Sequence, residues 1–190
     1  VIIKPVNGAC GEGIKKISYQ DTLNDANIYK NLIQDKFILE EIIQNHKEIR
    51  IINPQTLNTI RVMTLIKKDG RVKILKAFLR IGNGDSIVDN FHAGGIACQI
   101  DIETGILVTK GKSIYQKDNL KHPKTQVVLM GRKMPLWKEA KEFSIKLAKE
   151  NPKIRYIGWD IAITDNGIDL IEGNYVAGIT AFQFIDGKGM

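Results

Sequence analysis

The sequence predicts an α+β fold in which most strands pair antiparallel. Three stretches read as hairpins, each made of two strand-like runs joined by a glycine-containing turn, KDG, ETG or DNG. Two other stretches carry apolar residues at helical spacing. Hairpins that alternate with helices in this way are typical of antiparallel sheets covered by helices.

The first predicted elements form a small group of strands and one helix. VIIKP (1–5) and IKKIS (14–18) are strand-like runs that flank a glycine-rich segment, which predicts a hairpin-like unit. Apolar residues at helical spacing predict a helix over 22–36. FILEEII (37–43) is a continuous strand-like run.

The rest of the chain predicts a larger, sheet-rich part. It contains a short helix stopped before a proline, two hairpins, an amphipathic helix with a proline near its start, and a last hairpin. The short helix spans 45–55, and the two hairpins that follow span 58–82 and 94–111. The amphipathic helix spans 135–151 and the last hairpin spans 155–175. We therefore predict two lobes, a small one at 1–45 and a larger one at 46–190.

Composition indicates an ordinary globular protein. The 190 residues are 43% hydrophobic and 26% charged, and no apolar run reaches the length of a membrane span. Two cysteines without a secretory signal predict free thiols in a reducing, cytoplasmic compartment. The net charge of +7 indicates an anionic partner or a solvated basic surface. The chain starts inside a strand-like run, so we interpret it as part of a longer polypeptide.

A glycine-rich segment follows the first predicted strand. Gly8, Gly11 and Gly13 free the backbone for positive φ and for close approach to a ligand. Successive amide N–H groups in such a loop form an anion site, and Lys4 at the strand end adds a full positive charge. The segment predicts a polyphosphate site; the alternative is a hairpin turn beside a solvent-exposed lysine. Its spacing excludes a Walker A loop and a dinucleotide-binding fingerprint.

The last predicted hairpin brings two carboxylates together. With a three-residue loop at 165–167, Asp160 and Glu172 lie opposite each other, and Asn174 shares their face. Like charges in these positions repel, and a hard cation with oxygen ligands such as Mg²⁺ compensates them. The alternative is a solvated hairpin edge, against which the apolar neighbours of both acids argue.

Two arginines lie within apolar strand patterns. Arg61 and Arg80 are costly to bury without an anion, so each either neutralises a transferring phosphoryl group or forms a structural ion pair. In the strand of Arg80, alternation places Leu75 with Ala77 and Leu79 on the opposite face.

Polar groups in two further stretches are site candidates. Glu40 and Glu41 are neighbours in a strand-like run, so one faces a cleft unless both are exposed at an edge. VDNFHAGGIA (88–97) supplies Asn90 as a third candidate catalytic residue. In the same stretch His92 is either a general base or a structural histidine.

Together these stretches resemble the ATP-grasp superfamily. IIKPVNGACGEGI (2–14) resembles its strand lysine and glycine loop, FILEEII its interlobe hinge, and the last hairpin its magnesium hairpin. Within the superfamily, LNTIRVMTL, FLRIG and VDNFHAGGI are most similar to the sugar-transfer-associated ATP-grasp family, which is related to glutamate ligases. The motifs occur in the expected order over nearly the whole chain.

The resemblance implies an ATP-grasp fold that holds ATP between two α+β lobes. Lys4 and the loop from Gly8 to Gly13 would hold the ATP phosphates. Glu40 and Ile42 would offer backbone groups to adenine, and Glu41 or Glu48 would reach the ribose. Asp160, Glu172 and Asn174 would bind Mg²⁺.

Two positions depart from the superfamily pattern. Some relatives in the superfamily carry an arginine two residues before the first metal aspartate, where this chain has Gly158, so Arg80 or Arg61 would take over its role. Glu48, which matches the glutamate that follows the hinge, falls in a predicted helix.

The implied activity is carboxylate activation. ATP would phosphorylate a carboxylic acid, and an amine or another nucleophile would displace phosphate from the acyl phosphate. The implied partners are a small-molecule carboxylate and an acceptor such as an amino acid or sugar derivative, in polysaccharide or cell-surface sugar metabolism. The rival hypotheses are a non-catalytic nucleotide-binding module and a basic nucleic-acid-binding domain. For the ligase, Asp160→Asn or Glu172→Gln is expected to abolish turnover while the fold survives.

Overall fold

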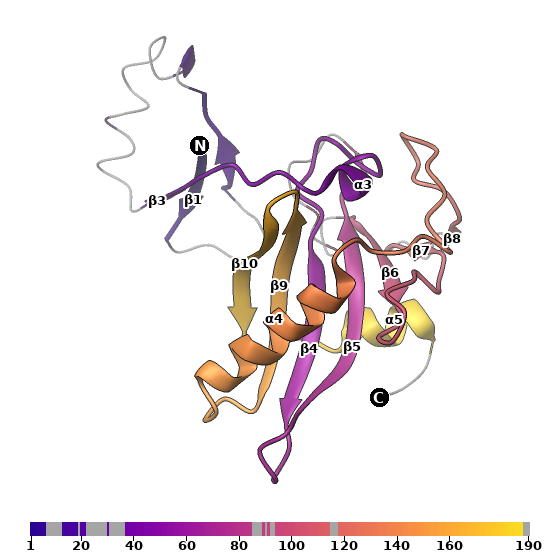
Figure 1. Ribbon diagram of the computed structural model, residues 1–190. Helices are drawn as coiled ribbons and strands as arrows, with labels where there is room; N and C mark the ends of the chain where they lie inside the picture. Colours follow the sequence, from indigo (N-terminus) through magenta and orange to yellow (C-terminus); the bar gives the residue numbers. More distant parts are fainter. Residues whose placement is uncertain are drawn as a thin grey trace. The chain divides into compact units, whose positions relative to one another are not determined.

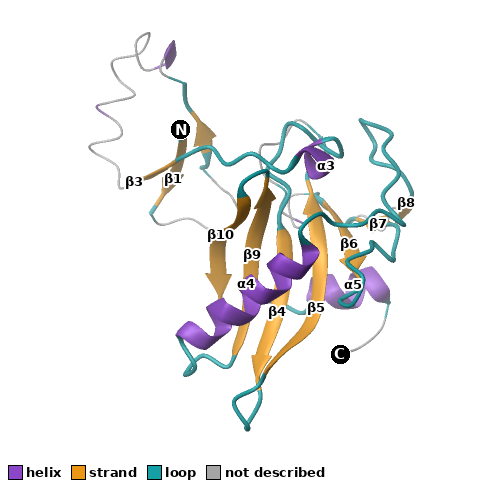
Figure 2. Cartoon of the chain, in the orientation of Figure 1, coloured by secondary structure: helices purple, strands orange, loops and turns teal. Residues whose placement is uncertain are grey.

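The computed structural model divides the chain into two compact units, Val1–Ile43 and Gln44–Met190. The first unit carries a small sheet, and the second carries a large sheet with helices; Figure 2 shows the distribution of secondary structure. The structure describes residues 1–6, 13–18, 20–21, 30, 37–84, 89, 91, 94–114 and 118–187.

The small sheet is antiparallel, with β1 between β2 and β3. Ile3, the buried residue of β1, lies opposite Lys15 on one side and Leu39 on the other. The predicted pairing of the first two strands is therefore confirmed. The predicted helix over 22–36 falls almost entirely outside the described residues. The strands are β1 (Ile2–Pro5), β2 (Lys15–Lys16) and β3 (Phe37–Glu40).

The large sheet has seven strands among the described residues, in the order β10-β9-β4-β5-β6-β7-β8 (Figure 1). Every neighbouring pair is antiparallel, which confirms the predicted α+β class. Because β9 pairs with β4, the last hairpin lies beside a hairpin that is about a hundred positions earlier in the chain. The strands are β4 (Ile60–Ile66), β5 (Val72–Ile81), β6 (Ile96–Ile100), β7 (Gly111–Lys112), β8 (Asp118–Asn119), β9 (Tyr156–Thr164) and β10 (Gly167–Asn174).

Helices lie on both faces of the large sheet. α4 (Trp137–Glu150) crosses one face, in front of the sheet in Figure 1, and α5 (Thr180–Asp186) packs on the other. The short α3 (Lys47–Arg50) ends before Pro54, as predicted, and Nδ1 of His46 accepts the Glu48 N–H at its start. The sequence analysis did not predict α5.

Each face has its own core. Trp137 of α4 packs with Trp159 and Ile161 of β9 on one side, and its indole N–H donates to the carbonyl of Ile102 at 2.8 Å. Trp137 is thus a core residue of the amphipathic helix predicted over 135–151. On the opposite side Phe182 of α5 meets Phe78 edge to face, with ring centroids 4.7 Å apart.

A bulge in β5 places Leu75 on the face opposite to the one predicted for it. The pairing of β5 with β4 skips Leu75, so the alternation of side chains reverses there. Leu75 packs against the core on the α5 side, whereas Ala77 and Leu79 belong to the core on the α4 side. The prediction that Leu75 shares their face is therefore wrong.

The hairpin predicted around ETG forms, but its second strand is irregular. Its turn forms, because the N–H of Asp101 donates to the carbonyl of Ile106 at 2.9 Å and Ile100 pairs with Leu107. Ile106, next to the turn, also pairs with Lys133, and farther from the turn the N–H of Val108 donates to the carbonyl of Gln99 at 2.9 Å. The second strand is thus reduced to isolated bridges before β7.

Candidate functional site

A row of paired side chains crosses the large sheet on the face of α5. Glu172 of β10 pairs with Asp160 of β9, Asp160 pairs with Arg61 of β4, and Arg61 pairs with Phe78 of β5. Directly paired residues of antiparallel strands point to the same face. Since Phe78 belongs to the core under α5, the two acids and Arg61 lie on that face as well.

The predicted opposition of Asp160 and Glu172 is confirmed, although the hairpin reaches it differently. The turn holds two residues, 165–166, because Thr164 already pairs with Gly167. A bulge at Ile171 then adds one residue to β10 and restores the register that a three-residue loop would give.

Both candidate arginines bind the carboxylate of Asp160. Nε of Arg61 donates to Oδ1, Nη2 of Arg61 donates to Oδ2 at 2.7 Å, and Nη1 of Arg80 donates to the same Oδ2 at 2.7 Å. Each arginine therefore forms a structural ion pair, one of the two alternatives that the sequence allowed for it. Their role in phosphoryl transfer stays a prediction.

The buried charges of this cluster stabilise one another. Burial raises the pKa of Asp160, but the hydrogen bond from Arg61 and the charges of Arg80 and Arg61 hold that pKa below its ordinary value. For Arg80, burial alone would lower the pKa, but the charges of Asp89 and Asp160 outweigh burial and raise the pKa above its ordinary value. Asp160 and Arg80 are therefore charged at neutral pH.

Asp89 is a third carboxylate of the site, and the sequence analysis missed it. Its Oδ1 lies 2.9 Å from Nη2 of Arg80, and its Oδ2 accepts both the N–H (2.8 Å) and the hydroxyl (2.5 Å) of Thr59. Burial raises the pKa of Asp89, against the effect of Arg80 and Thr59. A signal existed in the sequence, because two arginines in apolar strands need anionic partners and Asp89 stands in the stretch 88–97.

The row opens to solvent at one end. Glu172, at the end of the row, has a side chain that is 57% exposed, against 2% at Asp160 and 15% at Arg61. Oε1 of Glu172 lies 4.0 Å from Nη2 of Arg61 and accepts the side-chain N–H of Asn174 at 3.0 Å. A ligand of this cluster would therefore approach from Glu172.

The predicted Mg²⁺ ligands fit the ion in type but are not equally accessible. Asp160, Glu172 and Asn174 offer carboxylate and amide oxygens on one face, the donors that Mg²⁺ prefers. Glu172 and Asn174 are reachable, whereas both oxygens of Asp160 are held by guanidinium groups, so a cation at Asp160 requires Arg61 to shift. Within the described residues, no group of three or more His, Cys, Asp or Glu side chains is placed to hold a metal ion.

In the first unit, Lys4 contacts the carboxylate of Glu40. Nζ of Lys4 lies 2.5 Å from Oε2 of Glu40, and both side chains are partly exposed. They point to the same face because Lys4 pairs with Ile38, two residues from Glu40. The ammonium group predicted to bind phosphate thus has a carboxylate neighbour from the predicted hinge.

Gly13 ends the predicted glycine loop in a conformation that favours glycine. Its φ is +73°, and a Cβ at this position would lie 2.6 Å from Cγ of Pro5. Gly8 and Gly11 lie outside the described residues. The base of the loop therefore needs glycine on both conformational and steric grounds.

The remaining predicted site residues are dispersed or undescribed. Glu41 and Ile42 follow β3 with exposed side chains, and Glu48 is exposed in α3 of the second unit, in the helix expected for it. Asn90 and His92 lie outside the described residues.

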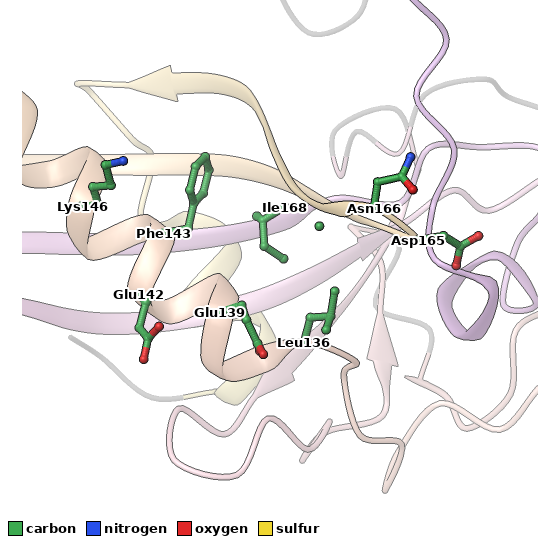
Figure 3. Close-up of a pocket in the computed structure, with 9 residues that line it drawn as sticks. Leu136, Glu139, Glu142, Phe143, Lys146, Asp165, Asn166 and Ile168 are labelled. Atoms are coloured by element: carbon green, nitrogen blue, oxygen red, sulfur yellow. The ribbon is translucent and has the colours of Figure 1, made fainter.

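A groove of about 580 Å³ lies beside α4 and the turn of the last hairpin (Figure 3). Phe143 and Ile168 supply apolar surface, and Glu139 and Glu142 add negative charge. None of the predicted site residues that the structure describes lines this groove. It belongs to the turn end of the hairpin, whereas Asp160 and Glu172 lie toward the opposite end.

A family model described as sugar-transfer associated ATP-grasp matches residues 1–190. Among curated proteins, none matches the chain. In the described part of the chain, no helix has the length and apolar character needed to cross a membrane. The family model covers the entire chain, and the chain therefore belongs to the sugar-transfer associated ATP-grasp family.

Proposed function

We propose that the protein is an ATP- and Mg²⁺-dependent ligase that joins a carboxylate to an amine or another nucleophile through an acyl phosphate. Membership of the family supports ATP-dependent ligase-type activity associated with sugar transfer. We take the acid or the acceptor to be a sugar derivative or an amino acid, in polysaccharide or cell-surface sugar metabolism.

The observation that carries the proposal is the charged row on the large sheet. Two guanidinium groups, Arg61 and Arg80, are fixed on Asp160, and the row opens at Glu172. Cationic groups that are already oriented stabilise the charge that develops on a transferring phosphoryl group. A buried pair with no open end would not support this function, since no phosphate could reach it.

The proposed reaction has two steps. A carboxylate oxygen of the acid attacks the γ-phosphorus of ATP, the bond from that phosphorus to its bridging oxygen breaks, and ADP leaves with the electron pair. The nucleophile then attacks the acyl carbon, inorganic phosphate leaves, and the proton of the nucleophile passes to solvent. Neither step needs a nucleophilic side chain of the protein, so its role is positioning and charge neutralisation.

We assign the ligands of the nucleotide by the sequence motifs. Lys4 and the loop that ends at Gly13 would bind the phosphates. The backbone of Glu40 and Ile42 would bind adenine, and Glu41 or Glu48 would bind the ribose. Glu172, Asn174 and, after a shift of Arg61, Asp160 would hold Mg²⁺. The ion would neutralise phosphate charge when bound.

The reaction can be tested by following the carboxylate oxygens. The protein is incubated with Mg²⁺, ATP and a panel of amino acids and of amino and carboxylated sugars, and ADP formation identifies the active pair. With an ¹⁸O-labelled acid, one labelled oxygen is expected in the released phosphate. Glu172→Gln is expected to abolish ADP formation, and Asp169→Asn, an exposed acid of the same strand, serves as the matched control. Unlabelled phosphate would contradict an acyl phosphate.

One observation favours a non-catalytic nucleotide-binding module as the second candidate. Both oxygens of Asp160 are engaged by arginines, which leaves two accessible metal ligands of the three predicted. A ligand that binds the native state raises its melting temperature. Protection by an ATP analogue that does not depend on Mg²⁺, together with no ADP formation across the panel, would favour the module.

A further inference from the structure

Asp89 accepts two hydrogen bonds from one residue, Thr59, which immediately precedes β4. Both the amide N–H and the hydroxyl of Thr59 donate to its Oδ2, at 2.8 and 2.5 Å, and its side chain is only 9% exposed. The carbonyl of the same Thr59 accepts the backbone N–H of Arg80 at 2.7 Å. Thr59 therefore fixes Asp89 relative to the strand that carries Arg80.

The guanidinium group of Arg80 lies between two carboxylates. Its Nη2 is 2.9 Å from Oδ1 of Asp89, and its Nη1 is 2.7 Å from Oδ2 of Asp160. A guanidinium group is planar, so partners on both terminal nitrogens fix its plane as well as its position. Arg61 differs, because within the described residues its side chain contacts the carboxylates of Asp160 and Glu172, at the open end of the row.

We propose that Asp89 is a positioning residue that holds the guanidinium group of Arg80 for phosphoryl transfer. This inference rests on the proposed function. If a cation draws Asp160 away from Arg80, Asp89 still holds Nη2 of that arginine. Asp89 thereby keeps the orientation of Arg80 when its other partner is engaged by a ligand. An arginine that must first be oriented during the reaction is a weaker catalyst than one oriented in advance.

The kinetic test compares variants that remove one contact each. Asp89→Asn is expected to lower kcat about 10- to 100-fold, the usual effect of losing a partner that orients a reacting group, with KM for ATP within about three-fold. Thr59→Val removes the hydroxyl donor and is expected to have an intermediate effect, and Thr59→Ser should recover most of that loss. Thr64→Val is the control for lost stability, because it removes the partner of the Trp159 indole on the opposite core and touches no residue of the row.

A purely structural role predicts a different result. In that case Asp89→Asn and Thr64→Val would lower activity only in proportion to the unfolded fraction, and kcat per folded molecule would stay at the wild-type value. That outcome would overturn the inference.

A second measurement decides the question independently of turnover. In ¹⁵N-arginine-labelled protein, the side-chain signal of Arg80 is assigned by its loss in Arg80→Lys. Asp89→Asn is expected to shift and broaden this signal, and Thr64→Val is expected to leave it unchanged. If the wild type forms no ADP, the proposed function fails while this spectrum still tests Asp89. An unchanged Arg80 signal in Asp89→Asn would overturn the inference even if the enzyme is active.

Discussion

The side chain of Arg61 lies over Gly158. A Cβ at Gly158 would be 3.1 Å from Cδ of Arg61, 3.0 Å from Sδ of Met63 and 2.6 Å from Cβ of Ala177. Gly158 stands two residues before Asp160 on the same face of β9. The absence of a side chain at 158 therefore leaves room for Arg61 to cross from β4 to Asp160. We infer that Arg61 supplies the charge that the superfamily pattern led us to expect at position 158.

This relationship predicts that Gly158→Ala is disruptive. The added methyl group would overlap Ala177 and crowd Arg61, so we expect a loss of about 1–3 kcal/mol of unfolding free energy. Urea denaturation measures the loss. Gly178→Ala is the matched control, since a Cβ at Gly178 has no neighbour within 4 Å and its stability should barely change. Equal stability of the two variants would show that Arg61 does not depend on a glycine at 158.

The two acids of the last hairpin should respond differently to neutralisation. Glu172→Gln is expected to stay folded and inactive, because this side chain is mostly exposed and lies at the open end of the row. Asp160→Asn leaves two guanidinium groups without their shared carboxylate, so we expect a loss of about 3 kcal/mol or more. This changes the expectation from sequence that both variants keep their fold.

Circular dichroism during denaturation and ADP formation by the folded fraction separate these effects. Asp169→Asn on the same strand controls for loss of a negative charge. A stable Asp160→Asn protein would mean that the arginines find other partners, and an active Glu172→Gln protein would remove Glu172 from the site.

The effect of Asp160 on stability should disappear in acid. Its pKa in the folded protein lies below the ordinary 3.8, so its contribution is present in full above that value and is lost as pH falls through the folded pKa. The stability difference between wild type and Asp160→Asn should therefore be constant from pH 7 to 5 and shrink below about pH 4. Asp89 has the opposite shift, but it is present in both proteins.

Urea denaturation at several pH values measures this difference. Ser144→Ala is the control, because it removes an uncharged hydrogen bond within α4, and its effect should not vary with pH. A difference for Asp160→Asn that persists unchanged at pH 3 would mean that the carboxylate is not stabilised by its arginines.

The hairpins were predictable because their signals are local. Turn glycines and short apolar runs set the strands of the last hairpin, and the opposition of Asp160 and Glu172 depends on the sum of turn and bulge residues. The predicted loop was one residue too long and the bulge at Ile171 was not foreseen, so two errors cancelled. In β5 no second error compensated, and the bulge moved Leu75 to the other face.

The charged cluster was only partly predictable because it depends on contacts between distant segments. Arg61, Arg80 and Asp160 were chosen from their apolar surroundings, but nothing local pairs them, since β4 and β9 are neighbours only in the sheet. Asp89 was missed for the same reason: its partners are Thr59 and Arg80. Sequence patterns locate costly buried charges, and tertiary pairing decides what neutralises them.

Lys4 should affect ATP binding much more than stability. Its ion pair with Glu40 is partly exposed, and such pairs contribute about 0–1 kcal/mol, so Lys4→Met should fold almost as stably as the wild type. If Lys4 binds ATP phosphate, the same variant should bind a fluorescent ATP analogue at least about tenfold more weakly, because a charge-assisted hydrogen bond is lost.

Lys15→Met, which changes an exposed lysine of the adjacent strand, is the control for Lys4→Met and should bind the analogue like the wild type. Glu40→Gln frees the ammonium group from its carboxylate and should not weaken binding. Unchanged affinity in Lys4→Met would exclude Lys4 from the nucleotide site, while leaving the assignment of the arginine cluster to be decided by Glu172→Gln.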